Sequence, residues 1–253
     1  MNNIKAIFIK QFVNQIKVPM IIIYGFMFLF IAVLFAVFLG EDEEKDCYTC
    51  IPEYVCEVCE EEAYHRFELP IPSGIGLFAV MFVGLGLLSS VSAVVIEEKT
   101  TKNLHFMKMA DVKPYQYLIG SVPSLMIIVG GVLLFYAFFH ALFYGEFGLE
   151  MLKFMGIGLA GGLVSVLFGL TFGLSKAPFL AMPVGIVLGL GPTMAPHNEA
   201  FARILRFTFV QQVNLGIAEL DSNLTSNFLI IAANGAVALL LFVLIHRKNQ
   251  FNV

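Results

Sequence analysis

Four cysteines are the residues of this sequence whose types and spacing most clearly allow chemistry. Cys47 and Cys50 form one C-x-x-C pair, and Cys56 and Cys59 form a second pair five residues later. Two such pairs can supply four thiolates to a tetrahedral Zn²⁺ ion, and in an oxidising compartment they can form disulfides instead. The short separation and the lack of glycines between the pairs weaken the zinc hypothesis, so we slightly favour disulfides.

The cysteines belong to a very acidic segment, residues 41–70, which lies between two long apolar stretches. Its many carboxylates favour a solvated loop. Disulfides or a metal ion would cross-link a loop that is too polar to build a core of its own. A catalytic dithiol is disfavoured because no thioredoxin-like pattern surrounds the pairs.

A second charged interruption covers residues 97–121 and is also flanked by apolar stretches. It mixes charged residues with Leu104, Phe106, Met107 and Met109. This pattern predicts a short amphipathic helix over 97–114 that ends near Pro114. Such a helix is too short and too charged to cross a bilayer, so it must lie at the surface or dock on a soluble partner.

The composition places these segments in a membrane protein. The chain is 58% hydrophobic and only 13% charged, with a mean hydropathy of +0.85, whereas a soluble domain carries about twice that charge. Apolar stretches near or above 18 residues predict membrane-spanning helices, and the chain reads as a single transmembrane domain over residues 1–253. The six expected spans are 18–40, 74–96, 117–139, 154–174, 177–190 and 227–245. The fifth is short, and we expect Pro183 to break it.

Two further segments read as helices that do not span. Residues 1–17 place Ile4, Ile7, Phe8 and Phe12 near one helical face, which predicts an interfacial helix. Residues 191–226 show partial helical periodicity interrupted by polar residues, which predicts a pair of short re-entrant or interfacial helices. Polar residues within the spans are expected to make helix contacts rather than to line a path. They are Ser89, Ser90, Ser92, Ser165, Thr171, Ser175 and Asn234.

The distribution of lysine and arginine predicts the orientation. Six spans put both termini on one side, which would carry ten basic residues against five on the other side. The richer side holds Lys5, Lys10, Lys17, Lys99, Lys102, Lys108, Lys113, Lys176, Arg247 and Lys248; the other holds Lys45, Arg66, Lys153, Arg203 and Arg206. Both termini and the 97–114 helix are therefore expected in the cytoplasm, and segments 41–70 and 191–226 outside.

The 97–121 segment resembles the loop after the second span of type-2 ABC exporter permeases. Glu97-Glu98-Lys99, Thr101, Leu104, Lys113 and Leu118-Ile119-Gly120 match that family in order. Thr100 replaces the usual Gly, and Asp111 stands where a Pro is common. Together with the six-span layout, the resemblance covers nearly the whole chain. Residues 201–212 also resemble permeases of bacterial peptide exporters of the phenol-soluble modulin type.

The resemblance implies an all-α integral membrane protein with six transmembrane helices, an N-terminal interfacial helix, a cytoplasmic coupling helix and an extracellular re-entrant helix pair. The coupling helix would sit on a separate ATPase, and the re-entrant pair would cap the translocation path. The coupling residues would be Glu97, Glu98, Lys99, Thr101, Leu104, Phe106 and Met107, and the gate would be formed by Phe201, Leu205 and Phe209.

The same resemblance implies the permease subunit of an ATP-driven exporter in the bacterial cell membrane. It would move amphipathic or hydrophobic cargo, whether peptide, lipid or drug, and would pair with a second copy or a paralogous permease. The chain has no Gly-Lys pair and so no phosphate-binding loop, so ATP and Mg²⁺ would belong to the ATPase subunit. No nucleic-acid partner is expected. The rival hypothesis is a non-transporting membrane sensor or scaffold that binds metal through its cysteine segment.

Overall fold

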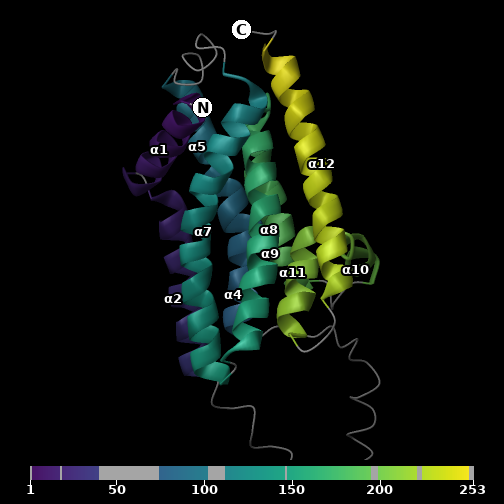
Figure 1. Ribbon diagram of the computed structural model, residues 1–253. Helices are drawn as coiled ribbons and strands as arrows, with labels where there is room; N and C mark the ends of the chain where they lie inside the picture. The colour runs from purple at the N-terminus through teal and green to yellow at the C-terminus, as the bar shows by residue number, and fades with distance from the viewer. Residues whose placement is uncertain are drawn as a thin grey trace, which may run out of the picture.

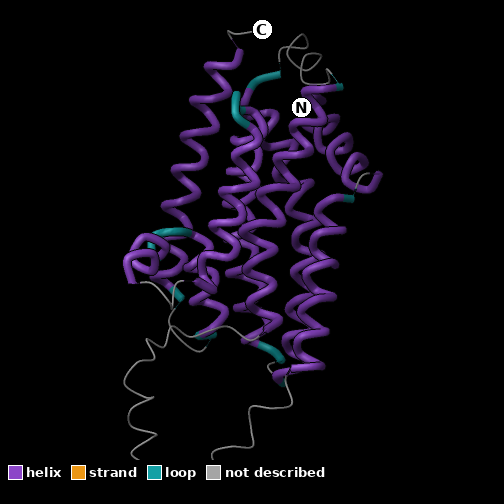
Figure 2. The backbone as a smooth tube through the Cα atoms, turned by 180° about the vertical axis from the view of Figure 1, so that it is seen from behind, coloured by secondary structure: helices purple, strands orange, loops and turns teal. Residues whose placement is uncertain are grey.

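The computed structural model describes residues 2–17, 19–39, 74–101, 112–145, 147–194, 199–220 and 224–250. Within these ranges the chain folds into helices and contains no strand (Figures 1 and 2). Five of the helices are long and apolar enough to cross a membrane, and a shorter apolar helix lies at residues 178–194. The chain is therefore an all-α, multi-pass membrane protein, as the sequence predicts.

The helices follow the predicted spans closely, with ends displaced by a few residues. The amino-terminal half contains α1 (Asn2–Lys17), α2 (Met20–Leu39), α4 (Gly74–Met81), the π-helical turn η1 (Phe82–Gly86), α5 (Leu87–Thr100) and α7 (Pro114–Tyr144). The carboxyl-terminal half contains α8 (Leu149–Leu174), η2 (Pro178–Leu180), α9 (Ala181–Met194), α10 (Glu199–Leu205), α11 (Phe209–Ala218) and α12 (Thr225–Gln250). Helices α4, η1 and α5 together form one continuous span.

The centre of the bundle is the contact between α5 and α8. An added Cβ on Gly169 of α8 would lie 2.7 Å from the Val91 Cβ, and one on Gly173 would lie 2.5 Å from the Val95 Cβ. Glycines four residues apart thus let the two backbones approach closely, as is common between helices in lipid. The pairing order shows that α5 and α8 run in the same direction.

Helix α9 carries the chain back towards the opposite end. Gly189 of α9 lies against Gly84 of η1. Gly185, one turn earlier in α9, lies against Leu85 and Ser89, which come later in the other span. Helix α9 therefore runs antiparallel to α5. The prediction that Pro183 breaks this segment is wrong. Pro183 lies in the first turn of α9, where the missing N–H has no helical partner to lose.

Helix α12 returns alongside α8 and in the same direction. Phe228 lies near Gly156, and Gly235 lies near Val164. As a result α12 ends at the same end of the bundle as α1 (Figure 1). The short α10 and α11 lie beside the amino-terminal part of α12 (Figure 1).

The middle of the bundle is tied together around η1. The Phe82 ring stacks on Tyr136 of α7 with ring centroids 5.9 Å apart. The Tyr136 hydroxyl donates a 2.9 Å hydrogen bond to the carbonyl of Gly25 in α2. The Ser165 hydroxyl of α8 donates to the carbonyl of Val83 within the π-turn. The sequence did not predict this π-turn, which is a type of irregularity often found at functional sites.

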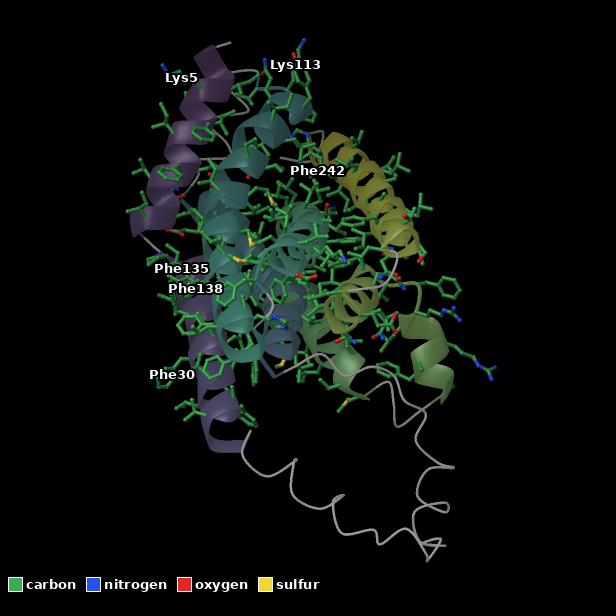
Figure 3. All side chains as sticks on the ribbon, turned by 60° about the horizontal axis from the view of Figure 1, so that its bottom comes forward. Lys5, Phe30, Lys113, Phe135, Phe138 and Phe242 are labelled. Carbon is green, nitrogen blue, oxygen red and sulfur yellow. The ribbon has the colours of Figure 1, made fainter. Side chains whose placement is uncertain are left out.

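The outer surface of the bundle is largely apolar. Phe30 of α2 and Phe135 and Phe138 of α7 lie exposed on the same flank (Figure 3). Most large apolar side chains of α12 are also exposed, including Leu229, Leu240 and Leu244. Exposed apolar flanks of this kind suit contact with lipid, because a bilayer core does not penalise them.

Candidate functional site: a buried ionic cluster at the end of α5

The last turn of α5 places one carboxylate inside the protein and its neighbour outside. Val91 and Val95 are fully buried, and Glu98 continues their i, i+4, i+7 face. Glu98 is consequently only 2% exposed, whereas Glu97 points outward. A buried carboxylate needs a counter-charge and hydrogen-bond donors.

Three donors from two other helices surround the Glu98 carboxylate. Lys10 Nζ of α1 lies 3.1 Å from Oε1, and Gln11 Nε2 donates to the same oxygen at 2.9 Å. The Tyr117 hydroxyl of α7 donates to Oε2 at 2.8 Å. We call these four residues the Glu98 cluster. Both carboxylate oxygens have partners, and the Lys10 side chain keeps 31% exposure. The cluster therefore satisfies the buried carboxylate and holds α1 and α7 against α5.

The next residue ties α5 to a fourth helix. Lys99 Nζ donates a 3.0 Å hydrogen bond to the carbonyl of Ser175, the residue that caps the end of α8. A cation at this position satisfies a carbonyl that has no partner within the helix and complements the helix dipole. Glu98 and Lys99 therefore connect α5 with α1, α7 and α8 at one end of the bundle.

The chain leaves α5 immediately after this junction. The Thr100 and Thr101 hydroxyls both donate to the carbonyl of Glu97, at 2.9 and 2.8 Å, and the Thr101 N–H donates to the same carbonyl. These bonds close the helix at Thr101. The last described residue of this stretch, Thr101, therefore lies three positions after Glu98.

The structure describes some of the predicted coupling residues and not the others. Glu97 and Thr101 are exposed, Lys99 is half-buried and Glu98 is buried. Residues 97–100 form the last turn of α5, so they extend a spanning helix rather than start a separate one. Leu104, Phe106 and Met107 lie outside the described residues, and the helix predicted over 97–114 stays a prediction there.

Sequence reasoning missed Lys10, Gln11 and Tyr117 as partners of Glu98. The predicted apolar face of the amino-terminal helix contained Ile4, Ile7, Phe8 and Phe12, but the buried face contains Ile7, Gln11 and Gln15. Their i, i+4, i+8 spacing was available as a signal. The predicted face contained only apolar residues, so the two glutamines were not assigned to it.

Two of the three predicted gate residues lie within the helical packing. Phe209 is 1% exposed, and its ring stacks on Phe168 of α8 with centroids 5.9 Å apart. Leu205 is 2% exposed and lies against Gly191 of α9. Phe201 is half-buried in α10. The structure therefore brings α10, α9 and α11 together at these residues.

Helix α11 also buries amide side chains. Gln211, Gln212 and Asn214 are each 3% exposed. Gln212 donates to the carbonyl of Arg206, whereas Gln211 Oε1 and Asn214 Oδ1 have no hydrogen-bond partner among the described residues. The polar interruptions of the 191–226 segment thus point inward, and this is a second polar region in the bundle.

Two of the polar residues within the spans make the predicted contacts between helices, and two others bond within their own helices. Ser165 and Asn234 bond to carbonyls of neighbouring segments, and Ser90 and Thr171 bond to carbonyls of their own helices. Only the bonds of Ser165 and Asn234 are the predicted packing contacts, whereas those of Ser90 and Thr171 satisfy the hydroxyl within one helix.

The predicted cysteine site, Cys47, Cys50, Cys56 and Cys59, lies outside the described residues. Disulfides and a bound metal ion both stay predictions for it. Within the described ranges, no group of three or more His, Cys, Asp or Glu side chains could hold a metal ion. Lys10 and Glu98 form an ion pair between two helices within the described part of the chain. Comparisons of this chain with protein families, curated proteins and solved structures find no match.

Proposed function

We propose that this chain is the membrane-spanning permease subunit of an ATP-driven ABC exporter of the type-2 class. It would move amphipathic or hydrophobic cargo out of a bacterial cell, powered by a separate ATPase subunit, and would work as a pair with a second copy or a paralogue. The observation that carries the proposal is the junction of Glu98 and Lys99 with three other helices, directly before segment 102–111.

A permease must convert a push on its cytoplasmic side into movement of its spans. Segment 102–111 continues from a turn in which adjacent residues bond to α1, α7 and α8. Force applied to this segment would therefore reach several helices at once rather than α5 alone. This arrangement supports the transmission role that the resemblance assigns to residues 97–114.

The course of α9 to α12 supports the same proposal. Helix α9 returns the chain as a short fifth traverse, and α10 and α11 then lie beside α12 (Figure 1). This order agrees with six spans and a re-entrant helix pair between the fifth and the sixth. Lys5 and Lys113 lie at one end of the bundle (Figure 3), which agrees with a cytoplasmic location of that end.

Removal of the apolar residues predicted to contact the ATPase tests the proposal. Leu104→Ala combined with Phe106→Ala should lower both ATPase co-purification and transport, because apolar anchors at interfaces typically contribute about 2 kcal/mol or more. The matched control is Lys102→Ala, which should have little effect, since exposed charges contribute roughly 0–1 kcal/mol. Binding is measured by co-purification of an ATPase with a phosphate-binding loop, and transport by cargo export from vesicles.

Normal ATPase binding and export by the Leu104/Phe106 double variant would show that this segment has no coupling role. If no ATPase binds the unaltered chain, and Zn²⁺ binds the cysteine segment, the sensor or scaffold hypothesis is favoured instead.

The proposed orientation makes a separate prediction. In a variant without native cysteines, a cysteine placed at Lys102 should resist an impermeant thiol reagent in intact cells. A cysteine placed at Glu146 should react, because the proposal puts the α7–α8 connection outside. Mass spectrometry of the labelled protein measures both. Reaction at position 102 with protection at position 146 would invert the topology and remove the basis for coupling.

A further inference from the structure

Helix α11 runs alongside α8 in the opposite direction and passes its midpoint. The Phe209 ring stacks on Phe168 of α8, and an added Cβ on Gly161 of α8 would meet the Val213 side chain. Gly161 is the thirteenth of the 26 residues of α8, a helix that is long and apolar enough to cross a membrane. Val213 therefore lies close to the middle of the membrane.

Two amide side chains of α11 lie at the same depth. Gln211 and Asn214 are two residues and one residue away from Val213, so they lie within about 3 Å of its level at 1.5 Å per residue. The added Cβ on Gly161 would also approach Val83 of η1. The amides are therefore level with the π-turn, which α9 also crosses.

Both amides belong to the side of α11 that is turned away from α8. The residues that lie against α8 are Phe209, Val213 and Gly216, which share one helical face. Gln211 and Asn214, three residues apart, belong to the opposite face. Each is only 3% exposed, so protein covers this face as well. The other helices that pack against α11 include α4, α9 and α12.

The buried oxygens of these amides are acceptors without a donor. No hydrogen bond reaches Gln211 Oε1 or Asn214 Oδ1 from the residues that the structure describes. Backbone N–H groups inside the surrounding helices donate within their own helix, so a donor has to come from a side chain or from a bound molecule. An amide oxygen without a hydrogen bond is costly at this depth, because the hydrocarbon core offers no donor in exchange.

A water molecule fits this pair of acceptors. It has two O–H donors, and side chains three residues apart on a helix are close enough for one water to contact both. Buried waters typically make about three hydrogen bonds to polar groups that are otherwise unsatisfied. A hard metal cation fits less well, because it prefers about six oxygen ligands, carboxylates among them. Within the described ranges, no group of three or more His, Cys, Asp or Glu side chains could hold such an ion.

We propose that Gln211 and Asn214 bind a water molecule in the middle of the membrane, on the face of α11 turned away from α8. The water donates one hydrogen bond to each amide oxygen. It hydrates the protein interior at the level of η1 and of the crossing by α9. The site does not depend on the permease proposal, because it rests on burial and hydrogen bonding within the bundle.

The test is footprinting with X-ray-generated hydroxyl radicals on the full chain in nanodiscs, followed by mass spectrometry. Radiolysis of a bound water oxidises the side chains beside it, even where bulk solvent does not reach. Val210 is the neighbour of Asn214 one helical turn away, and Val129 of α7 lies against Gly162 of α8 at nearly the same depth. Both valines are 0% exposed. Val210 should be oxidised severalfold faster than Val129, and equal rates overturn the proposal without the need for any variant.

Variants test whether the two amides hold the water. Gln211→Met with Asn214→Leu removes both acceptors at similar side-chain volume, so oxidation of Val210 should fall to the rate of Val129. The matched control is Gln212→Met, which removes a buried amide of the same helix that already has a partner in the protein, and it should leave oxidation of Val210 unchanged. Unchanged oxidation in the double variant overturns the assignment to these amides.

The choice of water over a cation is tested in the same assay. The footprint is recorded in sodium, potassium and choline buffers, and oxidation of Val210 should be the same in all three. Protection of Val210 by sodium or potassium, but not by choline, overturns the proposal in favour of a cation site. Size-exclusion chromatography verifies that each variant is folded.

Discussion

Replacement of Glu98 by alanine should lower the free energy of unfolding by about 3 kcal/mol. Removal of one partner from a buried ion pair costs about 3–5 kcal/mol, and the partial exposure of Lys10 places this site at the lower end. The buried Gln11 amide and Tyr117 hydroxyl also lose their acceptor. The measurement is reversible unfolding in mixed detergent micelles, together with protease sensitivity of α1, which should rise because α1 loses this attachment.

Two comparison variants separate the cluster from a general effect of altering α5. Glu97→Ala removes an exposed carboxylate from the same helical turn and should change the free energy of unfolding by about 0.5 kcal/mol or less. Glu98→Gln keeps the shape and some hydrogen bonds and should cost about 1 kcal/mol. Equal stability of the Glu98→Ala and Glu97→Ala proteins would mean that the cluster does not hold α1 in place.

Much of the fold was predictable because a bilayer imposes simple rules on sequence. Long apolar stretches can only be helices when they span lipid, so α2, α7, α8 and α12 lie where hydropathy placed them, with ends differing by a few residues. The predicted irregular helices over 191–226 correspond to α10 and α11. These predictions required no knowledge of tertiary contacts.

The predictions that failed concern features that depend on contacts between distant residues. Glu98 was predicted to belong to a coupling helix that contacts an ATPase, but it is buried within the bundle. Its burial depends on Lys10, which is 88 positions away in the chain. Pro183 was predicted to break a helix, but the effect of a proline depends on its position in the helix. Here α9 begins at Ala181, so Pro183 lies in the first turn. Side-chain periodicity in one helix cannot reveal which neighbour supplies a counter-charge.

Replacement of Gly84, where α9 crosses η1, should also lower the free energy of unfolding strongly. An added Cβ on Gly84 would lie 2.8 Å from the Cα of Gly189 and 2.9 Å from its nitrogen. These are backbone atoms, so no rotamer change can relieve the contact, and α9 must move away. Gly84→Val should therefore lower the free energy of unfolding by about 3 kcal/mol, the upper end of the usual cost of overpacking.

The control for this variant is Gly131→Ala in α7, where an added Cβ meets nothing within 4 Å. Because alanine favours helix more than glycine does, by about 1 kcal/mol, this change should be neutral or stabilising. Unfolding in mixed micelles measures both variants, and cross-linking of cysteines placed at Leu85 and Gly185 reports whether α9 still contacts the span. A Gly84→Val protein as stable and as readily cross-linked as the parent would show that α9 does not depend on this close approach. Loss of both properties, with Gly131→Ala unaffected, would establish that the return of the chain through α9 requires glycine at the crossing.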